Sequence, residues 1–294
     1  MLASMASAQT QISKYQPGVT PEGAVYFLPK TALRFVVQVE KTTYTPGDFA
    51  KYAERYLRLM DVAQEASVSY RVNSVTMTPF GVADTTKCFS VKFNAKNATA
   101  NVQLAEDGAL MAINATATVP AEPKAFVSAP KPRQVNPRQF MNEEILAAGS
   151  TAKMAELTAL EIYEIRDSKN QLVRGQADFM PKDGEQLRIM LDQLSAQDQA
   201  LTSLFAGKTV RDTTEHVFVY YPDSEVNRQV LFRLSDKLGV VDADDLSGAP
   251  YYISVTDLHS VPSKVQTGDD KKKKKVQPVE DGIYVNVPGK IRVD

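Results

Sequence analysis

The chain has 294 residues, and its 34 lysines and arginines nearly balance 35 aspartates and glutamates, which leaves a net charge of −1. This length favours two domains, and 43% hydrophobic residues is enough for packed cores, which excludes global disorder. The balanced charge argues against a dedicated nucleic-acid-binding protein, because such proteins usually carry an excess of basic residues. One cysteine, two histidines and no tryptophan leave few side chains for metal sites or histidine-based catalysis.

The first residues carry a pattern of small side chains. Ala6-Ser7-Ala8 before Gln9 matches the A-x-A site that signal peptidase cleaves, so residues 1–8 are expected to be the remnant of a signal peptide. No apolar run precedes this site, so the alternative is a small-residue terminus outside the fold. No apolar run anywhere in the chain approaches the ~20 residues that span a membrane, so no transmembrane segment is expected.

Residues 9–119 are expected to form a β-rich domain with one helix. The predicted strands cover residues 23–29 continuing into 33–40, 68–77, 88–93 and 110–116. Thr45-Pro46-Gly47-Asp48 is typical of a helix start, and the apolar spacing after it predicts about 14 helical residues. Asp107-Gly108 predicts a hairpin turn between the last two strands.

A proline-rich linker is expected at residues 120–137, because prolines remove backbone donors and no apolar period runs through this segment. After it, residues 138–294 are expected to form a C-terminal α+β domain. This domain is predicted to open with a helical hairpin over residues 140–206, whose second helix carries leucines at heptad spacing and ends at Gly207. The hairpin is expected to pack against a sheet, and a free-standing coiled coil is the alternative.

The rest of the chain is predicted to return to β-structure. The expected segments are strands within 208–259, a polar linker at 260–281 and the start of a further β unit at 282–294. Because residues 282–294 resemble strand, turn and second strand, the protein is expected to continue beyond Asp294. The predicted fold class is therefore α+β, with two β-rich modules and a helical hairpin leading the second.

Two motifs match catalytic or phosphate-binding patterns only in part. Ala206-Gly207-Lys208-Thr209 resembles the end of a phosphate-binding loop, but Thr202 stands where that loop needs its first glycine. Ser150-Thr151-Ala152-Lys153 fits the S-x-x-K pattern, but the other elements of serine β-lactamases do not follow in the required order. The favoured interpretations are a helix stop at Gly207 and a helix cap at Ser150.

The remaining polar clusters offer little for a metal ion. The acidic segment 242–248 departs from the EF-hand pattern, since Ile253 stands where that pattern needs a glutamate. His216 and His259 have no neighbour at metal-ligand spacing, and Cys88 has no second cysteine to form a disulfide. Lys271–Lys275 is flanked by acidic residues, which favours a solvated linker over an anion-binding site.

Several segments carry a family resemblance over nearly the whole chain. They are GAVYFLPKTAL (23–33), YTPGDFAKYAERYL (44–57), ADFMP (177–181) and LTSLFAGKT (201–209). In these segments the chain resembles a family of exported proteins from Bacteroidetes, classified as a domain of unknown function (DUF4831). The resemblance implies a bacterial envelope setting, and it brings no known activity and no catalytic residues.

The sequence favours an exported, non-catalytic envelope protein that works as a binding or structural module in the periplasm or at the cell surface. Its expected partner is an envelope protein or a glycan, and no nucleic acid. Tyrosines are the expected contact residues, namely Tyr26, Tyr44, Tyr52, Tyr56, Tyr220, Tyr221, Tyr251 and Tyr252. No catalytic, cofactor-binding or metal-binding residue is assigned.

The alternative is a glycosidase-like hydrolase that uses carboxylates alone. Such an enzyme needs two Asp or Glu side chains roughly 5–10 Å apart across a cleft.

Overall fold

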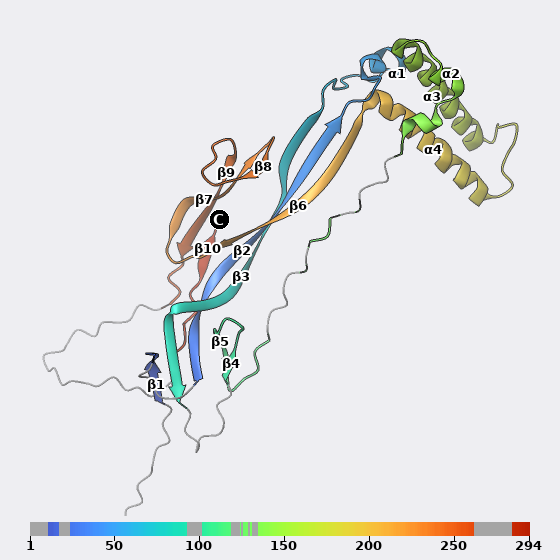
Figure 1. The fold of residues 1–294 in the computed structure, drawn as a ribbon. Helices are drawn as coiled ribbons and strands as arrows, with labels where there is room; N and C mark the ends of the chain where they lie inside the picture. Colours follow the sequence, from blue (N-terminus) through green and yellow to red (C-terminus); the bar gives the residue numbers. More distant parts are fainter. Residues whose placement is uncertain are drawn as a thin grey trace, which may run out of the picture.

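The computed structural model describes residues 11–17, 24–92, 102–118, 135–261 and 284–294, together with 124, 126–128 and 130. These residues form an elongated molecule, with a stalk of long strands, a helical head at one end and a smaller sheet against the side of the stalk (Figure 1). Helices and antiparallel sheets occur together, so the α+β class is confirmed. The expected signal remnant at 1–8 and the lysine run at 271–275 lie outside the described residues.

The stalk is an antiparallel sheet in the order β1-β3-β2-β6. Its strands are β1 (Gln11–Lys14), β2 (Ala24–Thr45), β3 (Ser67–Lys92) and β6 (Lys208–Tyr220). The predictions at 68–77 and 88–93 are parts of the single strand β3, so the predicted break between them is wrong. Because β6 pairs with β2, this sheet joins strands from both sides of residues 120–137. The division into two domains at this segment stays a prediction.

Two prolines lie inside these strands without interrupting them. The Ala83 N–H points away from β2 and donates to the Asp107 carboxylate at 2.7 Å. Because N–H and C=O groups alternate in direction along a strand, the backbone nitrogens and carbonyls of Gly81 and Pro79 also lie on the side away from β2. Pro79 is one of these positions and therefore costs the β2–β3 ladder no donor. On β2, Pro29 lies opposite Ala83, and its nitrogen faces the β6 side of the strand. The pairing of β2 with β6 begins only at Leu33, so no β6 residue needs a donor from Pro29. Both prolines stand where no ladder donor is needed.

The second sheet has the order β10-β9-β7-β8 and packs on one face of the stalk. Its strands are β7 (Val226–Ser235), β8 (Gly239–Val241), β9 (Ala249–Asp257) and β10 (Ile291–Val293). Phe232 and Leu234 on β7 pack with Val37 and Val39 of β2. The predicted alternation in β2 is therefore confirmed, because its odd-numbered apolar side chains face this sheet.

The last residues differ from the prediction of two strands at 282–294. Residues 284–290 are irregular, and only β10 pairs, with β9 as its partner. Val285 and Val287 are more than 60% exposed, so their alternation marks no buried face. Tyr284 instead fixes this segment to the stalk, because its ring stacks on Phe89 with the centroids 4.7 Å apart.

The predicted turn at Asp107-Gly108 forms, but the strand before it was assigned wrongly. The turn joins β4 (Val102–Leu104) to β5 (Leu110–Ile113), not residues 88–93 to β5. Gly108 has φ of +81°, which suits glycine, and the Asp107 carboxylate accepts the Ala109 N–H at 3.1 Å.

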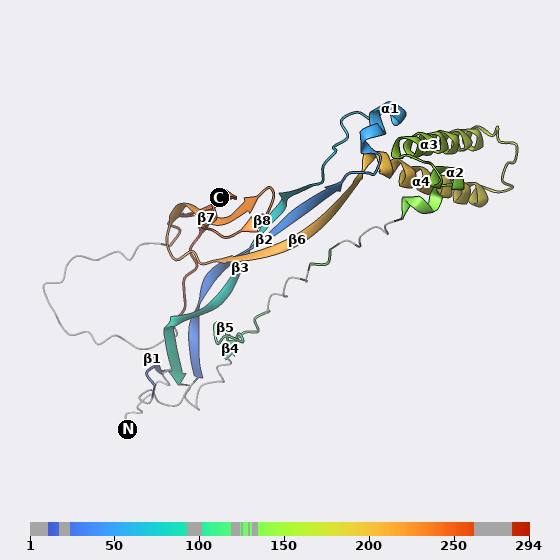
Figure 2. The same cartoon turned by 45° about the horizontal axis from the view of Figure 1, so that its top comes forward.

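The helical head stands at the end of the stalk (Figure 2). Its elements are η1 (Ala50–Tyr52), α1 (Ala53–Leu57), η2 (Pro137–Phe140), α2 (Glu143–Leu146), α3 (Thr151–Arg174) and α4 (Gly184–Ala206). The helix predicted after Thr45 is shorter than expected, because Arg58 takes a left-handed conformation (φ +55°) that ends α1. The hairpin of α3 and α4 and its stop at Gly207 are confirmed.

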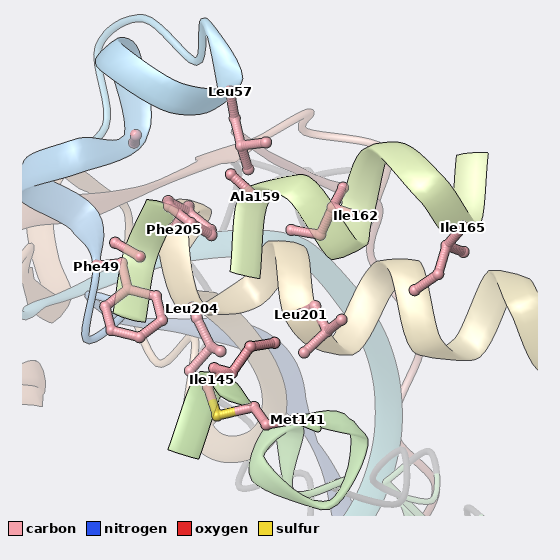
Figure 3. Packing of buried hydrophobic residues seen from close by; sticks show 12 residues of the cluster. Phe49, Leu57, Met141, Ile145, Ala159, Ile162, Ile165, Leu201, Leu204 and Phe205 are labelled. Carbon is pink, nitrogen blue, oxygen red and sulfur yellow. The ribbon is translucent and has the colours of Figure 1, made fainter. Parts of the chain in front are cut away.

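The core of the head is made by its own helices (Figure 3). Ile162 of α3 and Leu201 of α4 are fully buried, and Phe49 meets Phe205 with ring centroids 5.4 Å apart. The buried residues of this cluster come from the helices, from the turn before η1 and from Met141 between η2 and α2, and none comes from a strand. The predicted packing of the hairpin on a sheet is therefore wrong, since η1, α1, η2 and α2 cover it instead.

Candidate interaction surface

The partial motifs of the sequence have structural roles. Gly207 ends α4 and Lys208 begins β6, which is the reverse of the strand-then-helix order of a phosphate-binding loop. Ser150 caps α3 by accepting the Lys153 N–H at 3.2 Å, and the Lys153 ammonium pairs with Glu156 at 3.1 Å. Neither motif brings together the groups that its chemistry would need.

The acidic segment 242–248 forms a turn held by an arginine. The Arg233 guanidinium donates to the Ala243 carbonyl at 2.6 Å and to the Gly248 carbonyl at 3.0 Å. The Asp245 carboxylate accepts the Ser247 N–H at 2.8 Å, and this bond lowers the pKa of Asp245. The Asp245 carboxylate and the Ala243 and Gly248 carbonyls therefore serve to hold the turn together.

The histidines and the cysteine lie apart from one another. His216 lies on β6 beside Thr214, and His259 contacts Asp257 at 3.3 Å on an exposed loop. Burial raises the pKa of the Cys88 thiol on β3, which disfavours the thiolate. Among the described residues, no three His, Cys, Asp or Glu side chains come together as a metal site.

Carboxylates with a shifted pKa are the first place to look for a general acid. Within the described part of the chain, such shifts occur at Asp84, Glu185 and Asp245, and all of them are downward. The Thr86 hydroxyl, at 2.6 Å, is the main cause at Asp84, and the Arg188 guanidinium is the main cause at Glu185. A glycosidase acid needs the opposite shift, so these carboxylates do not support the hydrolase alternative.

The eight predicted tyrosines occupy buried, half-buried and exposed positions, and Tyr44, Tyr52, Tyr56 and Tyr220 are half-buried. Tyr26 is buried, whereas Tyr221, Tyr251 and Tyr252 are 36–47% exposed. Each exposed ring already has a partner on one side: Lys30 lies over Tyr221, Arg228 lies over Tyr252, and Phe232 stacks on Tyr251. The structure therefore gives three of the eight predicted tyrosines a surface position, and it does not gather all eight at one site.

The face of the stalk away from β7–β10 is a surface that the sequence did not lead us to expect. We call it the outer face, and it consists of every second side chain of β2, β3 and β6 in register. Its residues are Arg34, Val36, Gln38 and Glu40 on β2, Arg71, Ser74, Thr76 and Thr78 on β3, and Arg211, Thr213, Glu215, Val217 and Val219 on β6. Val217 and Val219 are 53% and 44% exposed.

Charges on the outer face are organised around one glutamate. The Glu40 side chain is only 14% exposed and lies between Arg71 of β3, at 2.9 Å, and Arg211 of β6, at 3.9 Å. Beside it, the Ser74 hydroxyl donates to the Gln38 side chain at 3.1 Å. The face thus presents hydroxyl, amide and paired charged groups next to two exposed valines.

The two long edges of the stalk differ. The edge of β3 is covered at three places: the Tyr70 backbone N–H donates to the Asp236 carbonyl at 2.8 Å, the Ala83 N–H donates to the Asp107 carboxylate, and β1 pairs with the end of the strand. Between Tyr70 and Ala83, Pro79 has no backbone N–H to donate. The outer edge of β6 pairs with no other strand of the described residues, has no register shift against β2 and contains no proline. Such an edge is a template for another strand.

The sequence carried a signal for this surface. In β6 the alternation of side chains continues from Lys208 to Tyr220, but both faces mix polar and apolar residues. A strand without a uniformly apolar face is typical of a sheet edge, so this mixed pattern is the sequence signal for an edge at β6.

None of the helices in the described ranges is long and apolar enough to cross a membrane. The comparisons returned no match among curated proteins and none among solved structures. A family model described as "Domain of unknown function (DUF4831)" matches residues 22–294. This match spans β2, β3 and β6 of the stalk, the head and the second sheet, and the chain therefore belongs to the DUF4831 family.

Proposed function

We propose that the chain is an exported protein of the bacterial cell envelope, in the periplasm or at the cell surface, and that it acts without catalysis as a binding or structural module. Its partner is an envelope protein or a glycan that contacts the outer face of the stalk. The observation that carries the proposal is the open part of the sheet. Along residues 34–40 of β2 and the parts of β3 and β6 aligned with them, one face has no layer of described residues over it, while the other face packs on β7–β10.

The chemistry of this face supports recognition of a polar ligand. The hydroxyl and amide groups around Glu40 offer donors and acceptors at the strand spacing of about 4.8 Å. The small-residue pattern at 6–8 and the resemblance to exported Bacteroidetes proteins are the support for the envelope location.

Site-specific photo-cross-linking in the producing cell tests the partner. We expect a cross-linking amino acid at Thr76, on β3 of the outer face, to give a discrete adduct with an envelope protein or glycan. The matched position is Leu160 on α3, which is 52% exposed and lies in the head, away from this face. Equal, diffuse labelling from both positions would contradict the proposed surface.

Cell fractionation tests the location separately. We expect the tagged full-length protein in the periplasmic or membrane-associated fraction of the producing cell. Its recovery with cytosolic enzymes would refute export while leaving the cross-linking result to be judged on its own.

A further inference from the structure

We propose that the outer edge of β6 pairs with the β6 edge of a second copy of this chain, which extends the stalk sheet across a two-fold axis at Thr213. This pairing goes beyond the proposed envelope role and does not depend on it, because the same edge would pair in purified protein.

The backbone of β6 presents the groups that such a pairing needs. Because the Ala83 N–H points away from β2, the ladder alternation places the N–H groups of Leu33, Phe35 and Val37 toward β6. The N–H and C=O groups of their β6 partners Tyr220, Phe218 and His216 therefore face β2. The N–H and C=O groups of the odd-numbered β6 residues point away from β2, toward the outer edge. An antiparallel partner along Lys208–Phe218 would make about ten ladder hydrogen bonds with these groups.

The charges of β6 select one register of this pairing. With Thr213 opposite the partner's Thr213, Arg211 lies opposite the partner's Glu215, and the two-fold axis creates this pair twice. Thr209 then lies opposite the partner's Val217, which covers part of that exposed side chain. Opposite charges directly across an antiparallel pair stabilise it.

The neighbouring registers are disfavoured by the same charges. Centring the pair on Arg211, on Asp212 or on Glu215 places that charged residue opposite its own copy. Centring on Thr214 leaves Arg211 opposite the partner's Val217. The self-complementary register at Thr213 is therefore the one that β6 fits best.

The second copy is the occupant that the sequence of β6 specifies, since the strand supplies both halves of the charge pair. The β3 edge does not offer this, because Pro79, the Asp236 carbonyl and Asp107 already interrupt or cover it. The smaller sheet packs on the face of the stalk and leaves the outer edge of β6 outside its ladder.

Sedimentation velocity of the purified full-length chain, over about a hundredfold range of concentration, tests the pairing. We expect a monomer–dimer equilibrium. Glu215→Arg should weaken it at least about tenfold, because two Arg–Arg contacts replace two attractive pairs. The charge swap Arg211→Glu with Glu215→Arg should restore dimerisation to near the original level.

Two further variants complete the experiment. Thr213→Pro removes an outward N–H and should abolish the dimer while leaving the β2–β6 ladder intact, and far-UV circular dichroism checks the fold. Arg188→Glu, a charge reversal on exposed α4, should change nothing. A chain that stays monomeric throughout, a dimer that tolerates Glu215→Arg, or a charge swap that fails to restore pairing would each overturn the proposal.

Discussion

Gly47 allows a close backbone contact where the stalk meets the head. Gly47 lies in the turn after β2, and a Cβ added there would overlap the Leu204 carbonyl and lie 2.7 Å from the Ser203 carbonyl oxygen at the end of α4. The adjacent Phe49 N–H donates to the same Leu204 carbonyl at 2.7 Å. The backbone of the turn and the last turn of α4 are therefore in direct contact, and this contact leaves no room for a side chain.

Gly47→Ala should lower the free energy of unfolding by about 3 kcal/mol, because two backbones must separate to admit the methyl group. The matched change Gly184→Ala, in the first turn of α4 with no atom near its added Cβ, should be neutral or stabilise by up to about 1 kcal/mol. Urea unfolding of both variants measures the difference, and similar midpoints would contradict the close contact at Gly47.

The Asp84 carboxylate makes the free energy of unfolding depend on pH. Hydrogen bonding from Thr86 holds the folded pKa of Asp84 below its unfolded value of about 3.9. The resulting stabilisation is therefore present above about pH 4 and is lost as the pH falls through the folded pKa. Thr86→Val should lower the urea midpoint at pH 7, and this loss should shrink as the pH falls below 4. Thr85→Val, one residue away and without this bond, should show no such trend.

At the scale of elements, local signals in the sequence predicted local structure well. Ser150 caps α3 and Gly207 ends α4, as predicted, because caps and stops depend on groups within a few residues. The alternation over 33–40 gave the correct buried face of β2. The apolar spacing that ran on to Met60 was misleading, since Met60 is 66% exposed and Arg58 had already ended the helix.

Partners between distant elements could not be predicted in the same way. Side-chain alternation fixes which face of a strand is buried, but not which strand pairs at its edge, so β6 was not placed beside β2. The outer face was missed for the same reason, because it exists only when three strands from distant segments are aligned. None of its residues stands in a motif of its own.

The hairpin of α3 and α4 offers a matched test of the head core. Ile162→Ala should cost about 2–5 kcal/mol of unfolding free energy, because the Ile162 side chain is fully buried against α4 and its neighbours. Leu160→Ala, two residues away and 52% exposed, should cost no more than about 1 kcal/mol. Equal losses of unfolding free energy for the two variants would contradict the burial of Ile162 and the exposure of Leu160.

At the scale of the whole molecule, the stalk makes the protein long. A compact chain of 294 residues would have a radius of gyration of about 19 Å. We expect small-angle scattering of the monomeric Glu215→Arg variant to give a clearly larger value, since the head and the β4–β5 hairpin stand at opposite ends of the stalk (Figure 1). A value near that of a compact chain would contradict the elongated arrangement.

The pairing of β6 with β2 has a consequence for the order of events during synthesis. About 160 residues separate the end of β2 from the start of β6. A ribosome adding about 5–20 residues per second needs roughly 10–30 s to cover that distance. The β2–β3 hairpin therefore leaves the ribosome well before its third strand exists, and during this interval β2 offers its bare edge to any neighbouring nascent chain. We expect the last step of stalk formation to await the head, which must be made before β6 can reach its place.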